Sequence, residues 1–261
     1  MLYQILIAGL GLSAALWLLW WWQTRSRDAS SVDAAWALGI GACAVWYASS
    51  GDGDGARRWL VAGLISVWSL RLGLHLVLDR VLRATAEDGR YAAMRAHWGP
   101  AANAHFAWFY QAQALAALLF SWPFLVGAHD PRPLGLGDAV AVGWWALTLA
   151  MVTVADRQLA RWRADPAHHG QTCRGGWWRY SRHPNYFFEW LHWFAYVALV
   201  WGGPAGPATL VVPALLLVLL LFVTGIPYVE ARALKTRGED YRRYQRETSM
   251  FVPLPPRQSA D

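Results

Sequence analysis

Polar side chains concentrate in one stretch of an otherwise apolar sequence. Residues 174–189 read RGGWWRYSRHPNYFFE and bring three arginines, a histidine, an asparagine and a glutamate together just before an apolar run. Arginine forks pair phosphate oxygens in two-point contacts, and carboxylates accept hydrogen bonds from sugar hydroxyls. The stretch therefore suits a ligand that carries phosphates and a ribose.

A helix is expected to begin within this stretch, near Pro184, whose missing N–H costs nothing in a first turn. Asn185 and Glu189 are four residues apart and should share one face of that helix. The first-turn amides and the positive end of the helix dipole would favour an anion. We expect Asn185 and Glu189 to bind a ligand; the alternative is plain capping of the helix.

Three polar segments, residues 79–102, 156–189 and 230–247, hold most of the charged groups that could join such a site. We expect them to converge at the cytoplasmic end of a helix bundle and form a basic cavity with aromatic edges. For any single arginine the alternative is the general excess of positive charge in cytoplasmic loops.

Some polar residues fall within or beside apolar runs. Arg71 is either a functional charge or one whose long side chain reaches the lipid headgroups. Asp33 either faces the dipole at a helix start or is an acid that donates a proton from an apolar substrate cavity. Gln111 and Gln113 bind a ligand oxygen or, as we prefer, a neighbouring helix.

These residues need membrane helices to position them. The chain has 261 residues, of which 56% are hydrophobic and 15% charged, where a soluble domain has about 25% charged residues. Several apolar runs approach or exceed the roughly 20 residues that cross a bilayer. The composition predicts an all-α, multi-pass integral membrane protein. The net charge of +6 fits cytoplasmic loops and does not indicate nucleic acid.

Seven spans are expected, with a surface helix in segment 79–102 and a charged amphipathic tail after residue 227. The spans are residues 2–22, 32–50, 59–78, 103–126, 139–155, 186–201 and 208–226. With the N-terminus outside, 19 of the 23 Lys and Arg residues lie in cytoplasmic segments, so the C-terminus is expected in the cytoplasm. We expect one integral membrane domain, with substrate-side helices in residues 1–130 and a cofactor-binding half in residues 131–261.

The central run resembles the C-terminal domain of the steroid 5-alpha-reductase family, and most closely its bacterial branch. The resemblance extends to VDAAW (32–36), RYAAMR (90–95), ADRQLARWRADP (155–166) and the tail from residue 226 to residue 256. It implies a seven-helix enzyme, in the bacterial inner membrane, that transfers hydride from NADPH to the carbon–carbon double bond of an enone lipid. The lipid substrate would enter from the bilayer.

The resemblance also implies roles for single residues. Asp156 and Arg163 match positions that line the nicotinamide-nucleotide site, and Asn185 and Glu189 match the family's Asn and Glu. The other cofactor-binding candidates are Arg71, Asp79, Arg179, Arg182, His183, Tyr186 and Glu230.

The family's Gln-Glu pair in span two and Tyr in span three are replaced here. Val32 and Asp33 stand for the pair, and Trp68 stands where the tyrosine would fall. The proton-donating groups are therefore changed or relocated, and Asp33 and Trp68 are the catalytic candidates.

Two other functions remain open. The RHPNY run and the tail also resemble isoprenylcysteine carboxyl methyltransferases, which bind S-adenosylmethionine at the same cytoplasmic end. A non-catalytic lipid-binding membrane protein would keep the fold without binding a nucleotide. No metal site is expected, since the histidines form no repeated cluster, and the oligomeric state stays open.

Overall fold

Apolar residues at helical spacing form helices over most of the chain, and the computed structural model describes residues 1–203 and 205–257. Within these residues there is no β-strand. The chain divides into two compact units. Unit 1 comprises Met1–Leu134 and Val200–Gly206, and unit 2 comprises Gly135–Leu199 and the chain from Pro207 onward.

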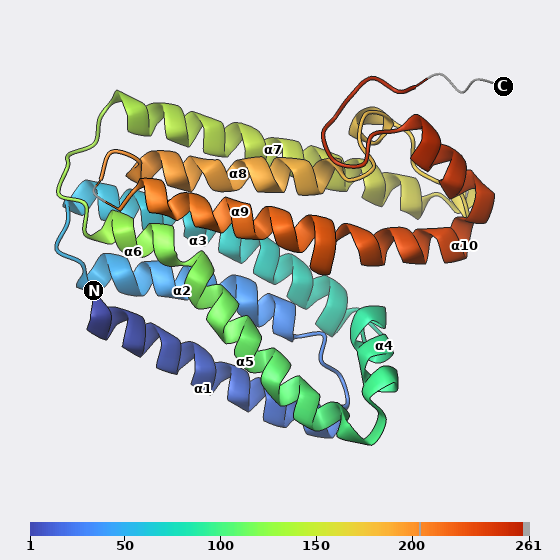
Figure 1. Cartoon of the computed structure of the whole chain (residues 1–261), viewed down its shortest axis with the longest axis horizontal. Helices are drawn as coiled ribbons and strands as arrows, with labels where there is room; N and C mark the ends of the chain where they lie inside the picture. Colours follow the sequence, from blue (N-terminus) through green and yellow to red (C-terminus); the bar gives the residue numbers. More distant parts are fainter. Residues whose placement is uncertain (204, 258–261) are drawn as a thin grey trace. The chain divides into compact units, whose positions relative to one another are not determined.

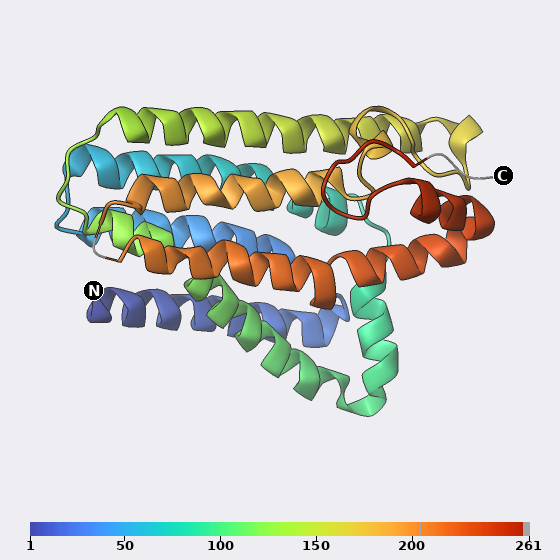
Figure 2. The ribbon, with the colours of Figure 1, turned by 45° about the horizontal axis from the view of Figure 1, so that its top comes forward.

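Unit 1 is a bundle of long helices with a shorter helix, α4, at one end (Figures 1 and 2). Its helices are α1 (Leu2–Ser26), α2 (Val32–Ser50), α3 (Gly55–Val77) with the π-turn η1 (Leu78–Leu82), α4 (Gly89–Trp98), η2 (Gly99–Ala101), α5 (Ala102–Phe120) and α6 (Trp122–Ala128). Aspartates start two of them. Asp54 accepts a hydrogen bond from the Arg57 amide at 2.9 Å, and Asp88 accepts one from the Arg90 amide at 2.9 Å.

Small residues bring α2 and α3 close together. The Ser69 hydroxyl donates to the Ala37 carbonyl across the two helices at 2.8 Å. A side chain at Gly41 would collide with Ser69, and one at Gly73 would collide with Leu38. Such close backbone approach at small residues is how helices pack in membranes, where burial of apolar surface does not drive helix association.

Unit 2 places α8 beside α7. Its helices are α7 (Leu136–Ala164), η3 (Pro166–His168), η4 (Gly176–Arg179), α8 (Pro184–Val200), η5 (Pro207–Leu210), α9 (Val211–Val218), the π-turn η6 (Leu219–Val223) and α10 (Ile226–Glu247). The indole of Trp144 in α7 donates to the Leu191 carbonyl of α8 at 2.9 Å. The indole of Trp190 in α8 donates to the Pro213 carbonyl of α9 at 3.1 Å, so α8 has helices on two sides.

Helix α10 bends sharply at Gly238, whose φ of 53° and ψ of −122° lie in a region open to glycine and strained for other residues. Figure 1 shows the second half of α10 turning away from the line of the first half. The bend lets side chains of the second half face side chains of the first, which matters for the polar cluster described below. The continuous charged pattern of residues 230–247 does not reveal it.

The prediction of an all-α, multi-pass membrane protein is confirmed. Six segments of the described chain are long and apolar enough to cross a membrane: Leu2–Ser26, Val32–Ser50, Gly55–Leu82, Gly89–Ala128, Leu136–Ala164 and Pro207–Glu247. Helix α8, the expected sixth span, is apolar but has only 17 residues. Large apolar side chains such as Leu10 and Phe222 are exposed on these helices, as lipid-facing residues should be.

The expected fourth span is interrupted rather than continuous. Helix α5 ends at Phe120 and α6 begins at Trp122, on either side of Ser121. Pro123 has no N–H to donate to the preceding turn, and the chain instead bonds the Phe124 amide to the Ser121 carbonyl at 3.1 Å. The orientation of the termini stays a prediction.

Candidate functional site

Polar groups gather at one end of unit 2, where the loop 165–183, the second half of α10 and the segment 248–257 lie together (Figures 1 and 2). The loop is tied to α7 by two bonds. The Trp178 indole donates to the Ala155 carbonyl at 2.9 Å, and the Trp177 amide donates to the Gln158 side chain at 2.9 Å. The two tryptophans of the RGGWWR run therefore fix the loop that leads into α8.

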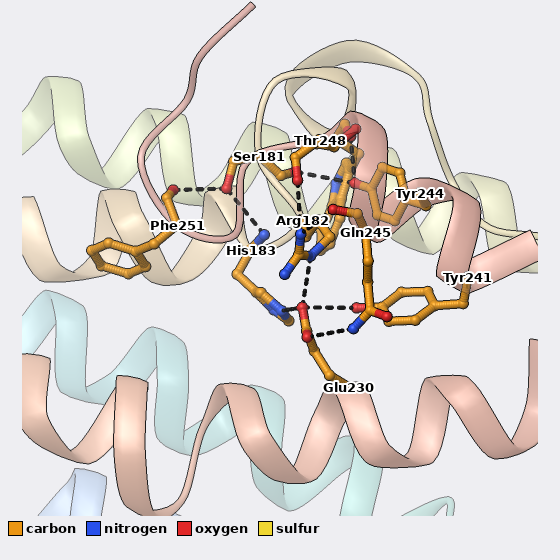
Figure 3. A network of polar contacts seen from close by, with 10 residues as sticks. Ser181, Arg182, His183, Glu230, Tyr241, Tyr244, Gln245, Thr248 and Phe251 are labelled. Atoms are coloured by element: carbon orange, nitrogen blue, oxygen red, sulfur yellow. Dashed lines mark hydrogen bonds and ion pairs between the residues drawn. The ribbon is translucent and has the colours of Figure 1, made fainter. Parts of the chain in front are cut away.

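One carboxylate, Glu230 of α10, organises a group of side chains that we call the Glu230 cluster: Arg182, His183, Glu230, Tyr241 and Gln245 (Figure 3). Arg182 Nε donates to Oε1 of Glu230 at 2.7 Å, and Gln245 Nε2 donates to Oε2 at 2.7 Å. His183 Nε2 lies 3.2 Å and the Tyr241 hydroxyl 3.3 Å from Oε1. Because Tyr241 and Gln245 follow Gly238, the bend in α10 is what brings them to Glu230.

Arg182 also holds the chain after α10. Its Nη1 donates to the carbonyls of Gln245 and Thr248 at 3.0 and 2.8 Å, and its side chain is only 10% exposed. The neighbouring Ser181 hydroxyl donates to the Phe251 carbonyl at 2.7 Å (Figure 3). These contacts use Nε and Nη1 of Arg182 and tie the chain after α10 to the loop before α8.

His183 is buried against Glu230, and its ring lies nearly parallel to that of Tyr186, with centroids 5.5 Å apart. Burial lowers the pKa of His183, and this effect outweighs the hydrogen bond and charge of Glu230, which act to raise it. The imidazole is therefore neutral near pH 7 and can donate Nε2–H to the carboxylate.

Asn185 and Asp156, two of the predicted cofactor residues, lie together. Asn185 Nδ2 in the first turn of α8 donates to Asp156 Oδ1 of α7 at 3.1 Å. Glu189 follows one turn later on α8, on the same face as Asn185. Asn185 lies three residues beyond Arg182 in the chain, so the pair adjoins the loop end that the Glu230 cluster holds together.

The other predicted residues are more dispersed. Arg163 is exposed in the last turn of α7, and Arg179 is exposed on η4. Arg71 lies on α3 and Asp79 on η1, both in unit 1, whereas the remaining cofactor candidates belong to unit 2. That these two sets bind one ligand stays a prediction.

The surroundings of Asp33 differ from the apolar pocket expected for a proton-donating acid. Arg80 pairs with its Oδ2 through a short contact, Arg90 Nη2 lies 2.6 Å from the same oxygen, and the Tyr91 hydroxyl donates to Oδ1 at 2.6 Å. All three partners are donors, so Asp33 acts here as an acceptor that holds residues 80–91 against the start of α2.

Asp88 belongs to the same group of charges. Its burial acts to raise its pKa, but the hydrogen bonds and charge of Arg90, with the charge of Arg80, outweigh burial and leave the pKa lowered. Arg80 and Arg90 therefore each contact both Asp33 and Asp88, and these contacts fix the segment before α4. Trp68, the other catalytic candidate, is buried in α3 with its ring edge-on to Trp36, 6.2 Å between centroids.

A buried polar chain inside unit 2 escaped the sequence analysis. The Trp145 indole donates to the Tyr196 hydroxyl at 2.9 Å, Tyr196 lies 3.0 Å from His192 Nε2, and His192 Nδ1 lies 3.0 Å from the Thr148 hydroxyl. His192 and Tyr196 are both fully buried. The signal was present, because Asn185, Glu189, His192 and Tyr196 recur at spacings of four, three and four along one helix face.

Within the described residues, no group of three or more His, Cys, Asp or Glu side chains could hold a metal ion. No match was found among curated proteins. One family matches, described as a protein of unknown function (DUF1295), over residues 19–248. The matched region includes every candidate residue from Asp33 to Glu230. This chain therefore belongs to the DUF1295 family.

Proposed function

We propose that this membrane protein is an NADPH-dependent reductase that transfers hydride to the carbon–carbon double bond of an enone lipid. The observation that carries the proposal is the bond between Asn185 and Asp156 beside the Glu230 cluster. It places an oriented amide, a carboxylate and several basic side chains at one end of an apolar helix bundle. DUF1295 membership, together with the resemblance of the central run to steroid 5-alpha-reductases, supports this activity over simple capping of α8.

The donor set fits a nicotinamide nucleotide. Asp156 uses one N–H of Asn185, and an amide side chain offers a second N–H and a carbonyl oxygen, which suit the carboxamide of the ring. Arg163 and Arg179 are exposed cations on α7 and η4 and suit phosphate oxygens. When bound, NADPH would supply the hydride; the protein supplies orientation and a dry site.

The Glu230 cluster acts in this proposal as a positioning group. Arg182 and His183 immediately precede α8, so their contacts with Glu230 fix the start of α8 and the position of Asn185 in its first turn. The contacts of Arg182 with Thr248 and of Ser181 with Phe251 hold the loop 165–183 and the segment 248–257 together. We assign Asp33 a positioning role as well, because its carboxylate accepts hydrogen bonds from Arg80, Arg90 and Tyr91 of segment 80–91.

The test compares thermal stabilisation of the detergent-solubilised protein by NADPH, NADH and S-adenosylmethionine. NADPH should raise the unfolding temperature, by an amount that grows with its concentration. Stabilisation by S-adenosylmethionine alone would replace the reductase with a methyltransferase. Stabilisation by none of the three would leave a lipid-binding protein without a nucleotide.

The matched variants are Asn185→Ala and Asn103→Ala, the latter at an exposed position at the start of α5. Loss of the Asn185 amide should weaken NADPH affinity about tenfold, the effect of one hydrogen bond of about 1.4 kcal/mol. Asn103→Ala should bind NADPH as the wild type does. Equal affinities in both variants would show that Asn185 is not a cofactor residue.

A further inference from the structure

Three polar side chains of unit 1 each have a buried N–H or O–H group that finds no hydrogen-bond acceptor. Among the described residues, these atoms include Nε2 of Gln23, the hydroxyl of Ser31 and the hydroxyl of Tyr110. Gln23 and Tyr110 are fully buried. Such groups are rare in native interiors, because each gives up the hydrogen bonds that it made to water. They come from three elements, α1, the residue before α2, and α5.

The three groups belong to one neighbourhood. Arg95 Nη2 donates to the oxygen of the Gln23 amide at 3.0 Å, which turns the Gln23 nitrogen away from Arg95. Arg95 is also among the charged groups around Tyr110, together with Asp28 and Glu87. The Ser31 hydroxyl lies near that of Tyr110, but the two do not together meet the distance and angles of a hydrogen bond.

Ser31 has an obvious alternative role that it does not take. It directly precedes α2, where a serine commonly accepts a hydrogen bond from the first helical amides, yet its side chain makes no such cap. The backbone around it is held elsewhere. The Ala29 amide donates to Glu87 Oε1 at 2.9 Å, and the Asp88 amide donates to the Ser30 hydroxyl at 2.8 Å. The Ser31 hydroxyl therefore does not cap α2, and it lies near the Tyr110 hydroxyl without a hydrogen bond to it.

The surrounding charges decide which acceptor would suit these donors. Arg95 is paired with Glu87 at 2.8 Å, and Asp28 adds a further negative charge nearby. An anionic phosphate or carboxylate would meet this excess of negative charge, whereas an uncharged oxygen would not. Aromatic rings lie next to Tyr110: the centroid of the Phe109 ring is 6.5 Å from that of Tyr110 and 6.3 Å from that of Phe106.

We propose that Gln23, Ser31 and Tyr110 bind the uncharged carbonyl oxygen of a lipid whose apolar body lies against these aromatic rings. The assignment rests on the proposed function, since an enone substrate carries such an oxygen. In this proposal the carbonyl oxygen lies between α1 and α5 of unit 1, and its hydrogen-bond donors are an amide and two hydroxyls, all uncharged.

The experiment measures lipid binding without NADPH, by quenching of tryptophan fluorescence in detergent. The probes are an alkyl-substituted cyclohexenone and the matching cyclohexene, which differ only in the carbonyl oxygen. Wild-type protein should bind the ketone about tenfold more tightly, as expected for a buried hydrogen-bonded carbonyl. Equal affinity for the two probes, or binding of neither, would overturn the proposal.

Tyr110→Phe should lose the preference for the ketone and bind the cyclohexene as before. Its unfolding temperature should be unchanged or higher, because the substitution removes a buried hydroxyl without a partner. The matched control is Tyr47→Phe, which removes a buried hydroxyl that is 3.3 Å from that of Ser121. This variant should unfold at lower temperature and keep the preference for the ketone.

If the Tyr110 hydroxyl instead binds only an ordered water, Tyr110→Phe should have the opposite effect. Its stability would fall and its preference for the ketone would stay unchanged, and this result would overturn the site. Ser31→Ala provides a second reading, with an expected loss of severalfold in ketone affinity. Because no NADPH is present, the outcome is separable from the proposed function. A protein that responds to NADPH but binds both probes equally refutes this site alone.

Discussion

The protonation of His183 gives the Glu230 cluster a dependence on pH. Burial lowers the pKa of His183 from the ordinary histidine value of 6.5, so the unfolded chain takes up this proton at a higher pH than the folded protein does. Stability is therefore complete above the unfolded pKa and falls as the pH drops from about 7 through the lowered pKa of the folded protein. Thermal unfolding in detergent across this range should show the loss.

His183→Gln removes the titrating group while keeping a side-chain N–H that can donate to Glu230. This variant should lose less stability than the wild type over the same pH range. His169→Gln, at an exposed loop position, is the control and should follow the wild type. A His183→Gln curve parallel to that of the wild type would mean that another group titrates in this range.

Local sequence spacing could identify these residues as special but could not identify their partners. Arg182 and His183 stand out as polar groups before an apolar helix, and we expected them to face a ligand. Their main partner, Glu230, lies 48 and 47 residues further along the chain, and the contact depends on how α10 folds back. Asp33 is a similar case, because Arg80 and Arg90 are 47 and 57 residues away.

At the scale of the element, α8 carries one polar face through an apolar bundle. Asn185 and Glu189 were predicted to share this face because they are four residues apart. His192 and Tyr196 continue it, and the Thr148 hydroxyl of α7 meets His192 while also donating to the Trp144 carbonyl of its own helix at 2.8 Å. The face thus joins α7 to α8 along much of their length.

Thr148→Val tests whether this bond stabilises the pairing of α7 and α8. Valine keeps the shape of threonine but removes the hydroxyl that lies 3.0 Å from His192 Nδ1, at an expected cost of about 1–2 kcal/mol. Thr153→Val is the matched control in the same helix, because the Thr153 hydroxyl bonds only the Leu149 carbonyl, one turn earlier, in the contacts described. Denaturant unfolding should separate the variants; equal stabilities would make the bond energetically neutral.

At the scale of the whole molecule, composition predicts the class of fold but does not predict where the helices break or bend. Long apolar runs predicted the membrane helices, since few other structures tolerate them. The break at Ser121 depends on the missing amide of Pro123, and the bend in α10 depends on the unusual dihedral angles of Gly238. Both are local backbone events within segments whose hydrophobic or charged pattern looks continuous.

The distribution of charge makes one prediction about the whole chain in its membrane. With the N-terminus outside, 19 of the 23 Lys and Arg residues fall in cytoplasmic segments, so the loop 165–183 and the C-terminus should lie in the cytoplasm, where a nucleotide is available. A fluorescent protein fused after the last residue should therefore fluoresce, and alkaline phosphatase fused there should be inactive.

The same two reporters inserted in the loop 129–135 should give the reverse result, because one membrane crossing separates that loop from each neighbouring polar segment in this topology. Active phosphatase at the C-terminus, with fluorescence from the loop 129–135, would invert the topology. The Glu230 cluster and the pair of Asn185 and Asp156 would then lie on the side of the membrane without NADPH. That result would contradict the proposed reductase, because the cofactor candidate Arg182 binds the C-terminal segment at Thr248 and lies on the same side of the membrane.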